Sequence, residues 1–322
     1  MRKILITFLI SGIAFGMISC GGSDSLSGSS SDNSTLTTGS LSGNGVFIVA
    51  GLSGNILKST DKGSSFDNAT SPTSKNLYEV EFGNSTFVVS GDNGTILKST
   101  DNGSSFDSIS TPTTNTLFGV GFGNNIFTAV GISGSIVKST DNGVTWDNAT
   151  SPTANYLRGI IFGNNTFIAV GDSGNIVRSD DGSSFDNVTS PVTSDLYGVG
   201  YGNSTFIAVG DNGTILRSTA ENGSSWDNAT SANTINLYGV VFGNNTFVAV
   251  GDNGTIVRST DNGLSWDNVT SPTSNFLIGI GFGYNTFVAV GTNGNILRST
   301  DNGSSWDNAT SPTVNQLRGV GF

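Results

Sequence analysis

The chain repeats one pattern of 40 residues seven times, and this repeat limits the possible folds more than any other feature. Each copy contains an eight-residue motif close to Ser-Thr-Asp-Asn-Gly-Ser-Ser-aromatic, the first at 59–66 and the last at 299–306. Repeats of this length bury their apolar sides against neighbouring repeats, so we expect a single array of seven units. The aromatic residues that end the motif, 39 to 41 residues apart, are Phe66, Phe106, Trp146, Phe185, Trp226, Trp266 and Trp306.

The two ends of the chain hold two parts of one repeat. The sequence ends at Phe322, a position after which other copies continue with Gly-Asn-x-x-Phe, as at 83–87. The pattern Gly-Asn-Gly-Val-Phe stands at the other end, at 43–47. We therefore expect residues 43–322 to form seven complete repeats that close into a ring.

Each repeat is predicted to form four short strands. In the copy at 237–276, β-forming residues occur at 237–242, 246–250, 255–259 and 264–269, separated by turns rich in Gly and Asn. Four antiparallel strands per 40 residues are typical of one propeller blade. The predicted fold is therefore an all-β, seven-bladed β-propeller. Pairing of the C-terminal strand at 317–322 with the N-terminal strands at 46–69 would close it, and we expect a monomer.

Composition agrees with this fold and excludes some chemistry. The chain contains 45 Gly and 6 Pro, and 35% of its residues are hydrophobic, which suits an all-β protein with many tight turns. Because it has no His, a His general base or a His metal ligand is impossible. A single Cys excludes an internal disulfide. We expect no cofactor and no metal.

The N-terminal segment resembles a bacterial lipoprotein signal. Arg2 and Lys3 precede an apolar run at 4–18, which is shorter than the roughly 20 residues that span a bilayer. Cys20, the only Cys, follows at the place where such signals carry the lipidated residue. The resemblance implies a signal peptide at 1–19, a lipid on Cys20 and a place in the cell envelope; the alternative is an ordinary secretory signal.

Charge limits the partners of the mature chain. Removal of residues 1–19 takes away two basic residues and no acidic one, which leaves a net charge of about −13. Such a chain repels nucleic acid and anionic lipid, so we expect contact with a membrane only through the lipid on Cys20. Residues 20–42 lack periodicity and are predicted to be a flexible tether with an r.m.s. span of about 25 Å.

The eight-residue motif resembles the Asp box of sialidases, related glycoside hydrolases, sortilin-type receptors and photosystem II stability/assembly factor-like proteins. The resemblance implies that the acid forms a turn and that the aromatic packs between strands; it implies no particular activity. Two copies depart from the pattern, at 179–185, where one residue is lost, and at 218–226, where Glu replaces Asp and we expect the loosest turn. The predicted structural acids are Asp61, Asp101, Asp141, Asp180, Glu221, Asp261 and Asp301.

A basic residue recurs once per repeat in the third predicted strand. We expect these residues to pair with acids of the adjacent hairpin rather than to form an anion-binding ring, because acids outnumber bases in this chain. The recurrent Asp-Asn-Gly turns lack the acid ladder of a calcium loop and are interpreted as turns. The basic residues are Lys58, Lys98, Lys138, Arg178, Arg217, Arg258 and Arg298.

The seven copies differ most at three positions that a propeller brings to one face. These are the residues on either side of the Leu that opens the first strand, and the first residue of the turn after the second strand. Loops that vary on a constant scaffold are typical of a binding surface; drift among duplicated copies is the alternative. The candidate binding residues are Leu52, Lys75, Glu79, Glu81, Ile132, Tyr156, Arg158, Asp195, Phe276 and Arg318.

These observations predict a non-catalytic binding or scaffold protein rather than an enzyme. The sialidase group uses an arginine cluster and a Tyr–Glu pair on six blades, whereas this chain has seven repeats and only three glutamates, Glu79, Glu81 and Glu221. A protein partner is the first hypothesis. The alternative is a carbohydrate-binding propeller or, less favoured, a glycoside hydrolase.

Overall fold

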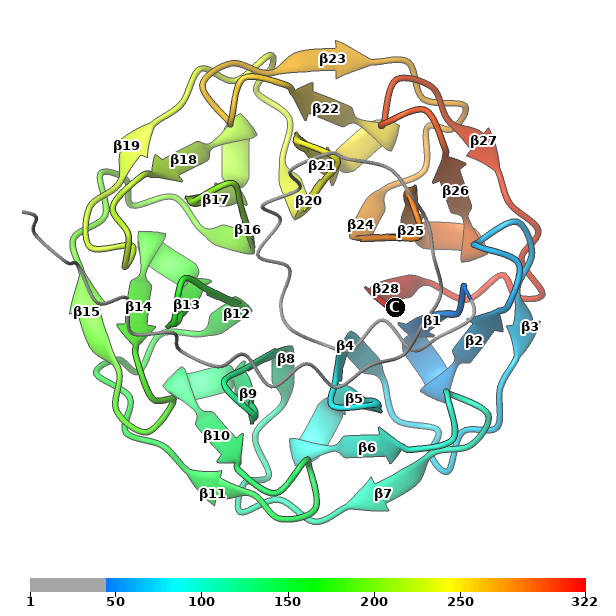
Figure 1. The fold of residues 1–322 in the computed structure, drawn as a ribbon, viewed down its shortest axis with the longest axis vertical. Helices are drawn as coiled ribbons and strands as arrows, with labels where there is room; N and C mark the ends of the chain where they lie inside the picture. Colours follow the sequence, from blue (N-terminus) through cyan, green and yellow to red (C-terminus); the bar gives the residue numbers. More distant parts are fainter. Residues whose placement is uncertain (1–44) are drawn as a thin grey trace, which may run out of the picture. The chain divides into compact units, whose positions relative to one another are not determined.

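The computed structural model describes residues 45–322, which form seven four-stranded antiparallel sheets arranged around a central axis (Figure 1). The predicted all-β seven-bladed propeller is confirmed. The predictions for 1–19, for 20–42 and for Cys20, together with the first two residues of the predicted propeller, lie outside the described residues.

Blades are numbered here from the first complete sheet. Blade 1 holds β4 (Leu77–Gly83), β5 (Thr86–Gly91), β6 (Ile96–Ser99) and β7 (Asp107–Ile109); blade 2 holds β8 (Leu117–Gly123), β9 (Ile126–Gly131), β10 (Ile136–Ser139) and β11 (Asp147–Asn148); blade 3 holds β12 (Leu157–Gly163), β13 (Thr166–Gly171), β14 (Ile176–Ser179) and β15 (Asp186–Val188); blade 4 holds β16 (Leu196–Gly202), β17 (Thr205–Gly210), β18 (Ile215–Ser218) and β19 (Asp227–Asn228). Blade 5 holds β20 (Leu237–Gly243), β21 (Thr246–Gly251), β22 (Ile256–Ser259) and β23 (Asp267–Val269); blade 6 holds β24 (Leu277–Gly283), β25 (Thr286–Gly291), β26 (Ile296–Ser299) and β27 (Asp307–Asn308); blade 7 holds β28 (Leu317–Gly321), β1 (Phe47–Gly51), β2 (Ile56–Ser59) and β3 (Asp67–Asn68).

Blade 7 joins the two ends of the chain and closes the ring. Its innermost strand, β28, pairs antiparallel with β1, with Val49 opposite Val320 and Ala50 opposite Gly319. Figure 1 shows the C-terminal strand in red beside the N-terminal strand in blue. Every blade is thus a complete four-stranded sheet, as predicted.

The outermost strand is shorter than the sequence predicted. In blade 5 it covers Asp267–Val269, whereas a strand was predicted from 264. The reason lies in the Asp box, because the Asp261 carboxylate accepts the backbone N–H groups of Leu264 and Ser265 at 3.1 and 3.0 Å. These N–H groups are therefore used in the turn and do not join the sheet.

The hydrophobic core lies between blades. One cluster joins Ile207 and Val209 of blade 4 to Phe247 and Trp266 of blade 5, and all four side chains are buried. The ring centroids of Phe247 and Trp266 are 6.3 Å apart. Each blade buries both of its sheet surfaces, one against each neighbouring blade, which explains why a single repeat has no core of its own.

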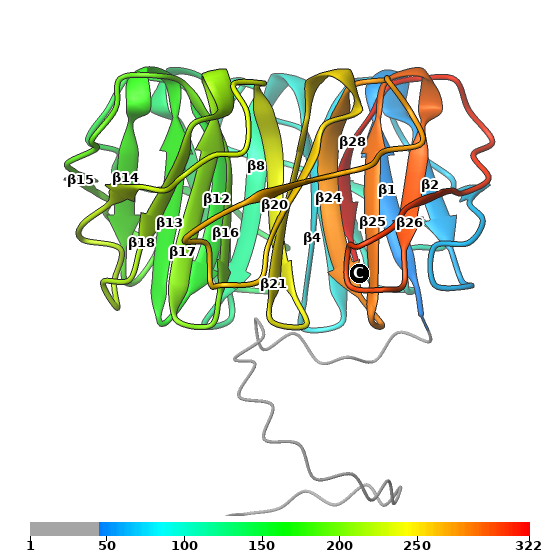
Figure 2. The same cartoon turned by 90° about the horizontal axis from the view of Figure 1, so that it is seen from above.

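The ring has two faces with different loops (Figure 2). We call the turn face the one that carries the short 3-10 turns between second and third strands and the loops that lead into each innermost strand. The box face carries the hairpins between first and second strands and the Asp boxes. The turns of the turn face are η1 (Leu52–Gly54), η2 (Asp92–Gly94), η3 (Ile132–Gly134), η4 (Asp172–Gly174), η5 (Asp211–Gly213), η6 (Asp252–Gly254) and η7 (Thr292–Gly294).

Candidate binding face

Every innermost strand contains one β-bulge near the turn face. In blade 1, Leu77 is paired with Gly91 and Glu79 with Ser90, so that Tyr78 is an extra residue without a ladder partner. A bulge re-aims the side chain that it carries. The seven bulge residues, which we call the bulge ring, are Tyr78, Phe118, Arg158, Tyr197, Tyr238, Ile278 and Arg318.

The bulge ring forms a chain of aromatic and cationic contacts around the mouth of the central channel. The ring centroids of Tyr78 and Phe118 are 5.2 Å apart, as are those of Tyr197 and Tyr238. The guanidinium of Arg158 lies 5.1 Å from the Phe118 ring and 5.8 Å from the Tyr197 ring, so it joins the two aromatic pairs. Each cation–π contact of this kind is worth roughly 0.5–1 kcal/mol.

Most polar members of the bulge ring bind the first residue of the 3-10 turn in their own blade. The Tyr78 hydroxyl donates to Asp92 Oδ1 at 2.7 Å, and burial together with this acid raises the pKa of Tyr78 to about 12. Arg158 donates to both carboxylate oxygens of Asp172, at 2.7 and 3.2 Å. This contact is the one ion pair within residues 45–322. Two of the three variable positions are therefore joined in space.

The third variable position precedes each innermost strand and serves two purposes. Asn76 accepts the backbone N–H of Ser53 at 3.0 Å, and Asp195 accepts that of Ser173 at 2.7 Å, so both cap the turn of the preceding blade. The side chains of Tyr156 and Phe276 make no such bond, and these residues are 39% and 44% exposed. These two blades therefore present an aromatic side chain to solvent in place of a cap.

The remaining candidates on the turn face are less distinctive. Leu52 and Ile132 are half-buried on their turns, and Lys75 is exposed in the loop before β4. Val314, in the corresponding loop of blade 7, is 82% exposed and was absent from the predicted set. Val314 thus extends the exposed apolar surface beyond the predicted residues.

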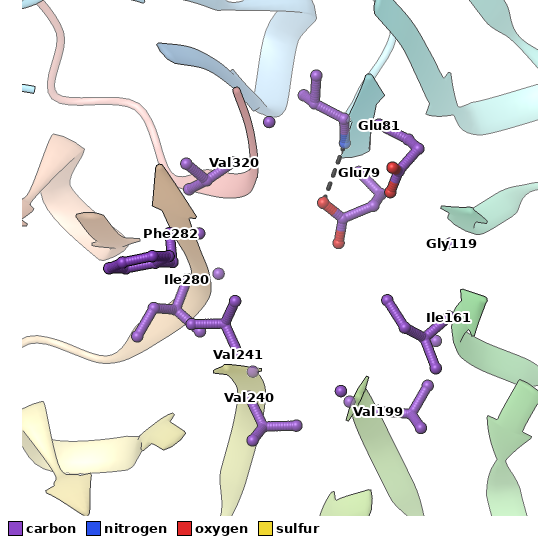
Figure 3. Close-up of a pocket in the computed structure, with 18 of the residues that line it drawn as sticks. Glu79, Glu81, Gly119, Ile161, Val199, Val240, Val241, Ile280, Phe282 and Val320 are labelled. Atoms are coloured by element: carbon purple, nitrogen blue, oxygen red, sulfur yellow. Dashed lines mark hydrogen bonds between the residues drawn. The ribbon is translucent and has the colours of Figure 1, made fainter. Parts of the chain in front are cut away.

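Glu79 and Glu81 lie inside the channel rather than on the rim where the sequence comparison placed them. Both belong to β4 and line a cavity of about 240 Å³ (Figure 3). Strand alternation puts the two side chains on the same side of β4, and the corresponding positions of the other blades are Gly, Ile or Val. The placement on the binding face was wrong because residues two and four places beyond Leu77 are already well inside the ring.

The channel environment favours the protonated form of this pair. Burial raises the pKa of Glu79 to about 7, although the backbone N–H of Val80, 3.0 Å from its Oε1, acts in the opposite direction. Burial and the neighbouring Glu79 raise the pKa of Glu81 well above its ordinary value. Figure 3 shows the pair facing a lining of Ile161, Val199, Val241, Ile280 and Val320.

The box face repeats one hydrogen-bonding pattern. In the last copy, Asp301 accepts the Ser305 hydroxyl at 2.6 Å, the Ser305 N–H at 2.9 Å and the Ser299 hydroxyl at 2.8 Å. The Ser305 hydroxyl and the other donors hold the pKa of Asp301 at about 2. The acids of the box thus act in turn formation.

Two of the predicted box acids need comment. In the shortened copy, Asp181 rather than Asp180 accepts from Ser179 Oγ and Ser183 N, at 3.2 and 2.8 Å, because the lost residue lies after the acid. Asp180 accepts from Thr166 Oγ1 instead. In the copy with Glu221, the buried Ser218 Oγ has no partner within the described chain. The longer Glu side chain does not reproduce the bond that Asp301 makes with Ser299.

The basic residues of the third strands do not pair with acids, so that prediction was wrong. Lys58 Nζ donates to Ser104 Oγ at 2.9 Å, and Arg258 Nε donates to the carbonyl of Asn302 at 2.7 Å. Both acceptors belong to the Asp box of the next blade. Lys58 and Arg258 therefore tie neighbouring blades together through the box turns.

The predicted set of binding residues omitted five members of the bulge ring: Tyr78, Phe118, Tyr197, Tyr238 and Ile278. They occupy the same repeat position as the predicted Arg158 and Arg318, so the signal was present. Within residues 45–322, no three Asp, Glu, His or Cys side chains come together as a metal site would require. No helix in this part of the chain is long and apolar enough to cross a bilayer.

Comparison with family models identifies the family of this chain. The model of the DUF6242 beta propeller domain matches residues 120–237 and 214–317, which together span more than half of the sequence. The chain belongs to this family. No curated protein matches the sequence.

Solved structures show the same fold at low sequence identity. YCF48 bound to a D1 peptide is 18% identical, with a TM-score of 0.61 over 74% of this chain and 81% of that one. YCF48 from Cyanidioschyzon merolae is 17% identical, with a TM-score of 0.61 over 78% and 90%. The computationally designed Ika8 protein is 12% identical, with a TM-score of 0.63 over 85% and 86%. These likenesses concern the propeller fold.

Proposed function

We propose that this propeller is a non-catalytic binding protein that presents its turn face to a protein partner. The observation that carries the proposal is the bulge ring, in which aromatic and cationic side chains from all around the ring meet at one channel mouth. Aromatic and Arg side chains are the groups that most often carry binding energy in protein interfaces. YCF48, with the same fold, is known bound to a peptide, which supports this class of function.

Tyr156 and Phe276 are the proposed anchors around the mouth. Both side chains are exposed, and both replace a residue that caps a turn in blades 1 and 4. Giving up a local hydrogen bond for an exposed aromatic ring favours a role outside the fold, and the Tyr156 ring in addition joins the bulge ring, 5.5 Å from the guanidinium of Arg158. The Asp boxes, by contrast, use their polar groups within their own turns.

The experiment is affinity capture from the native cell envelope with the full protein as bait. The test variant is Tyr156→Asn/Phe276→Asn, because Asn stands at this position in blade 1 and makes the capping bond there. The matched control is Val144→Ser/Leu264→Ser on the box face, where both side chains are also exposed and other copies carry Ser. We expect the turn-face variant to lose the captured protein and the control to retain it. Equal capture by both variants would refute the assignment of the face.

We also propose that the protein is held in the cell envelope by a lipid on Cys20, as its resemblance to lipoprotein signals implies. Labelling of cells with a radioactive fatty acid tests this. We expect label on the wild-type protein and none on Cys20→Ser, and label on both would contradict the proposal.

A carbohydrate partner is the second candidate, because aromatic rings such as Tyr78 and Phe118 can stack on sugars as well as on peptides. A glycan array, followed by a hydrolysis assay on any sugar that binds, separates this candidate from the first. Specific binding that Tyr156→Asn/Phe276→Asn abolishes would favour the carbohydrate interpretation.

A further inference from the structure

The bulge ring contains two arginines whose surroundings differ in one respect. Arg158 of blade 3 binds Asp172, the first residue of η4, through two parallel hydrogen bonds. Arg318 occupies the same position in blade 7, where the first residue of the turn is Leu52. The acid that satisfies one arginine is thus replaced by an apolar side chain at the other.

Arg318 has no replacement for that acid within residues 45–322. Its Nε is buried and has no hydrogen-bond acceptor, and the residue forms no ion pair in this part of the chain. The nearby Asp92 already accepts bonds from the Tyr78 hydroxyl and from Thr116 Oγ1, at 2.7 and 3.2 Å. A buried N–H donor without an acceptor is unfavourable.

The guanidinium of Arg318 lies against an aromatic surface. It is 5.1 Å from the centroid of the Tyr78 ring, which in turn contacts Phe118. The Tyr78 hydroxyl is held by Asp92, so this ring has a fixed position. Arg318 is therefore positioned by packing on one side while its buried donor remains unsatisfied.

We propose that Arg318 binds a carboxylate of the protein partner, which supplies the acceptor that Asp172 supplies to Arg158 in blade 3. This inference rests on the proposed function and names the chemistry of the partner. A guanidinium presents parallel N–H donors that match the two oxygens of a carboxylate, as the Arg158–Asp172 pair of this same molecule demonstrates. The carboxylate belongs either to an acidic side chain or to a chain end.

Arg318 lies nearer the turn face than the glutamate pair of the channel. Glu79 and Glu81 lie farther along the channel than the bulge residue Tyr78, on the same strand, β4. Strand β4 neighbours β28, which carries Arg318, around the ring. A partner carboxylate that approaches from the turn face therefore meets Arg318 before it reaches the glutamate pair.

The test variant is Leu52→Asp, which supplies blade 7 with the acid found in blade 3. Three peptides serve as probes: acetyl-Gly-Gly-Tyr-Gly-Gly with a free C-terminal carboxylate, its C-terminal amide, and the amide form with one internal Asp. Binding is followed by the Nε–H resonance of Arg318 in nuclear magnetic resonance spectra at millimolar peptide. The Arg318→Met variant, which lacks this resonance, identifies it.

We expect at least one carboxylate-bearing peptide, but not the neutral amide, to shift the Arg318 resonance of the wild-type protein in a saturable way. The peptide that binds distinguishes a chain end from an acidic side chain as the source. In Leu52→Asp the affinity should fall at least tenfold while the melting temperature stays equal or rises, so that unfolding does not explain the loss. The box-face variant Val144→Ser/Leu264→Ser should keep the shift at Arg318.

Absence of a shift with both carboxylate peptides, or an unchanged affinity in Leu52→Asp, would overturn the proposal. The outcome is separable from that for the proposed function. If a protein is captured through Tyr156 and Phe276 but Leu52→Asp captures it equally well, the binding function stands and the carboxylate site fails. If a carboxylate peptide binds as expected but no protein is captured, the site stands without the proposed partner.

Discussion

The two faces of the propeller are built from the same repeat and differ in where their polar groups are used. On the box face, Asp301 uses its carboxylate oxygens on Ser299 and Ser305, within its own turn. On the turn face, Tyr78 binds Asp92 and Arg158 binds Asp172. At the same position, Phe118 and Ile278 are apolar, and Arg318 has Leu52 in place of an acid. Uniform chemistry indicates a structural task on one face, and varied chemistry on the same scaffold indicates a surface for something else.

The largest expected contrast concerns the aromatic residues of the two faces. Trp266 ends an Asp box and is 4% exposed between blades, whereas Phe276 is 44% exposed on the turn face. Trp266→Ala should lower the free energy of unfolding by about 3–5 kcal/mol, because it leaves a cavity in the core. Phe276→Ala should change it by less than about 0.5 kcal/mol. Denaturant unfolding of both variants measures the contrast. Similar decreases in the free energy of unfolding of the two variants would contradict it.

A second contrast is in pH dependence, since the acid pair in the channel and the box acids have opposite shifts. The pKa of Glu79 is raised from 4.5 to about 7, so the folded state holds a proton that the unfolded state has lost in this interval. The Glu79 proton alone should therefore lower stability by up to about 1.4 kcal/mol per pH unit as pH rises from 5 to 7, and the raised pKa of Glu81 adds to this fall. Glu79→Gln/Glu81→Gln should remove most of this slope. Thermal melts across this range measure it, and a flat wild-type profile would contradict the channel environment described above.

Protonation of the box acids should lower the stability of the fold, and it should do so at lower pH than the titration of the channel pair. The pKa of Asp301 is lowered from 3.8 to about 2, so its stabilising effect is complete above its unfolded value and is lost as pH falls towards 2. Asp301→Ala should cost on the order of 1–2 kcal/mol at neutral pH, since it removes an acceptor for several exposed donors. Asp172→Ala on the turn face is the comparison variant. Chemical denaturation at pH 7 and pH 3 should show that the Asp301 effect shrinks in acid.

The smallest expected effect is a repair of the irregular box. Glu221 replaces Asp in that copy, and the neighbouring Ser218 Oγ is buried without a partner in the described chain. Glu221→Asp shortens the side chain towards the geometry of the other boxes and should raise stability by about 0.5–1 kcal/mol. The melting temperature of this variant is the measurement. A decrease would indicate that the extra residue in this copy, rather than the longer acid, causes the irregularity.

Sequence comparison located much of the turn face but not its organisation. Arg158, Arg318, Tyr156 and Phe276 were found because they differ between copies at equivalent positions. The bulge that carries two of them was not predictable, because an apolar pattern does not specify the residue at which a strand gains an extra member. The placement of Glu79 and the identity of the box acid at Asp181 depended on local backbone geometry in the same way.

The sequence by itself determined the blade count, the four strands of each blade and the closure of the ring, because period and turn chemistry are local and recur seven times. Only the tertiary structure decided which side chains meet. Tyr78, Phe118 and Arg158 lie about one repeat apart along the chain and become neighbours because adjacent innermost strands pack around one axis. The same packing leaves Arg318 beside Leu52 without an acid, a pairing between opposite ends of the chain that exists only in the closed ring.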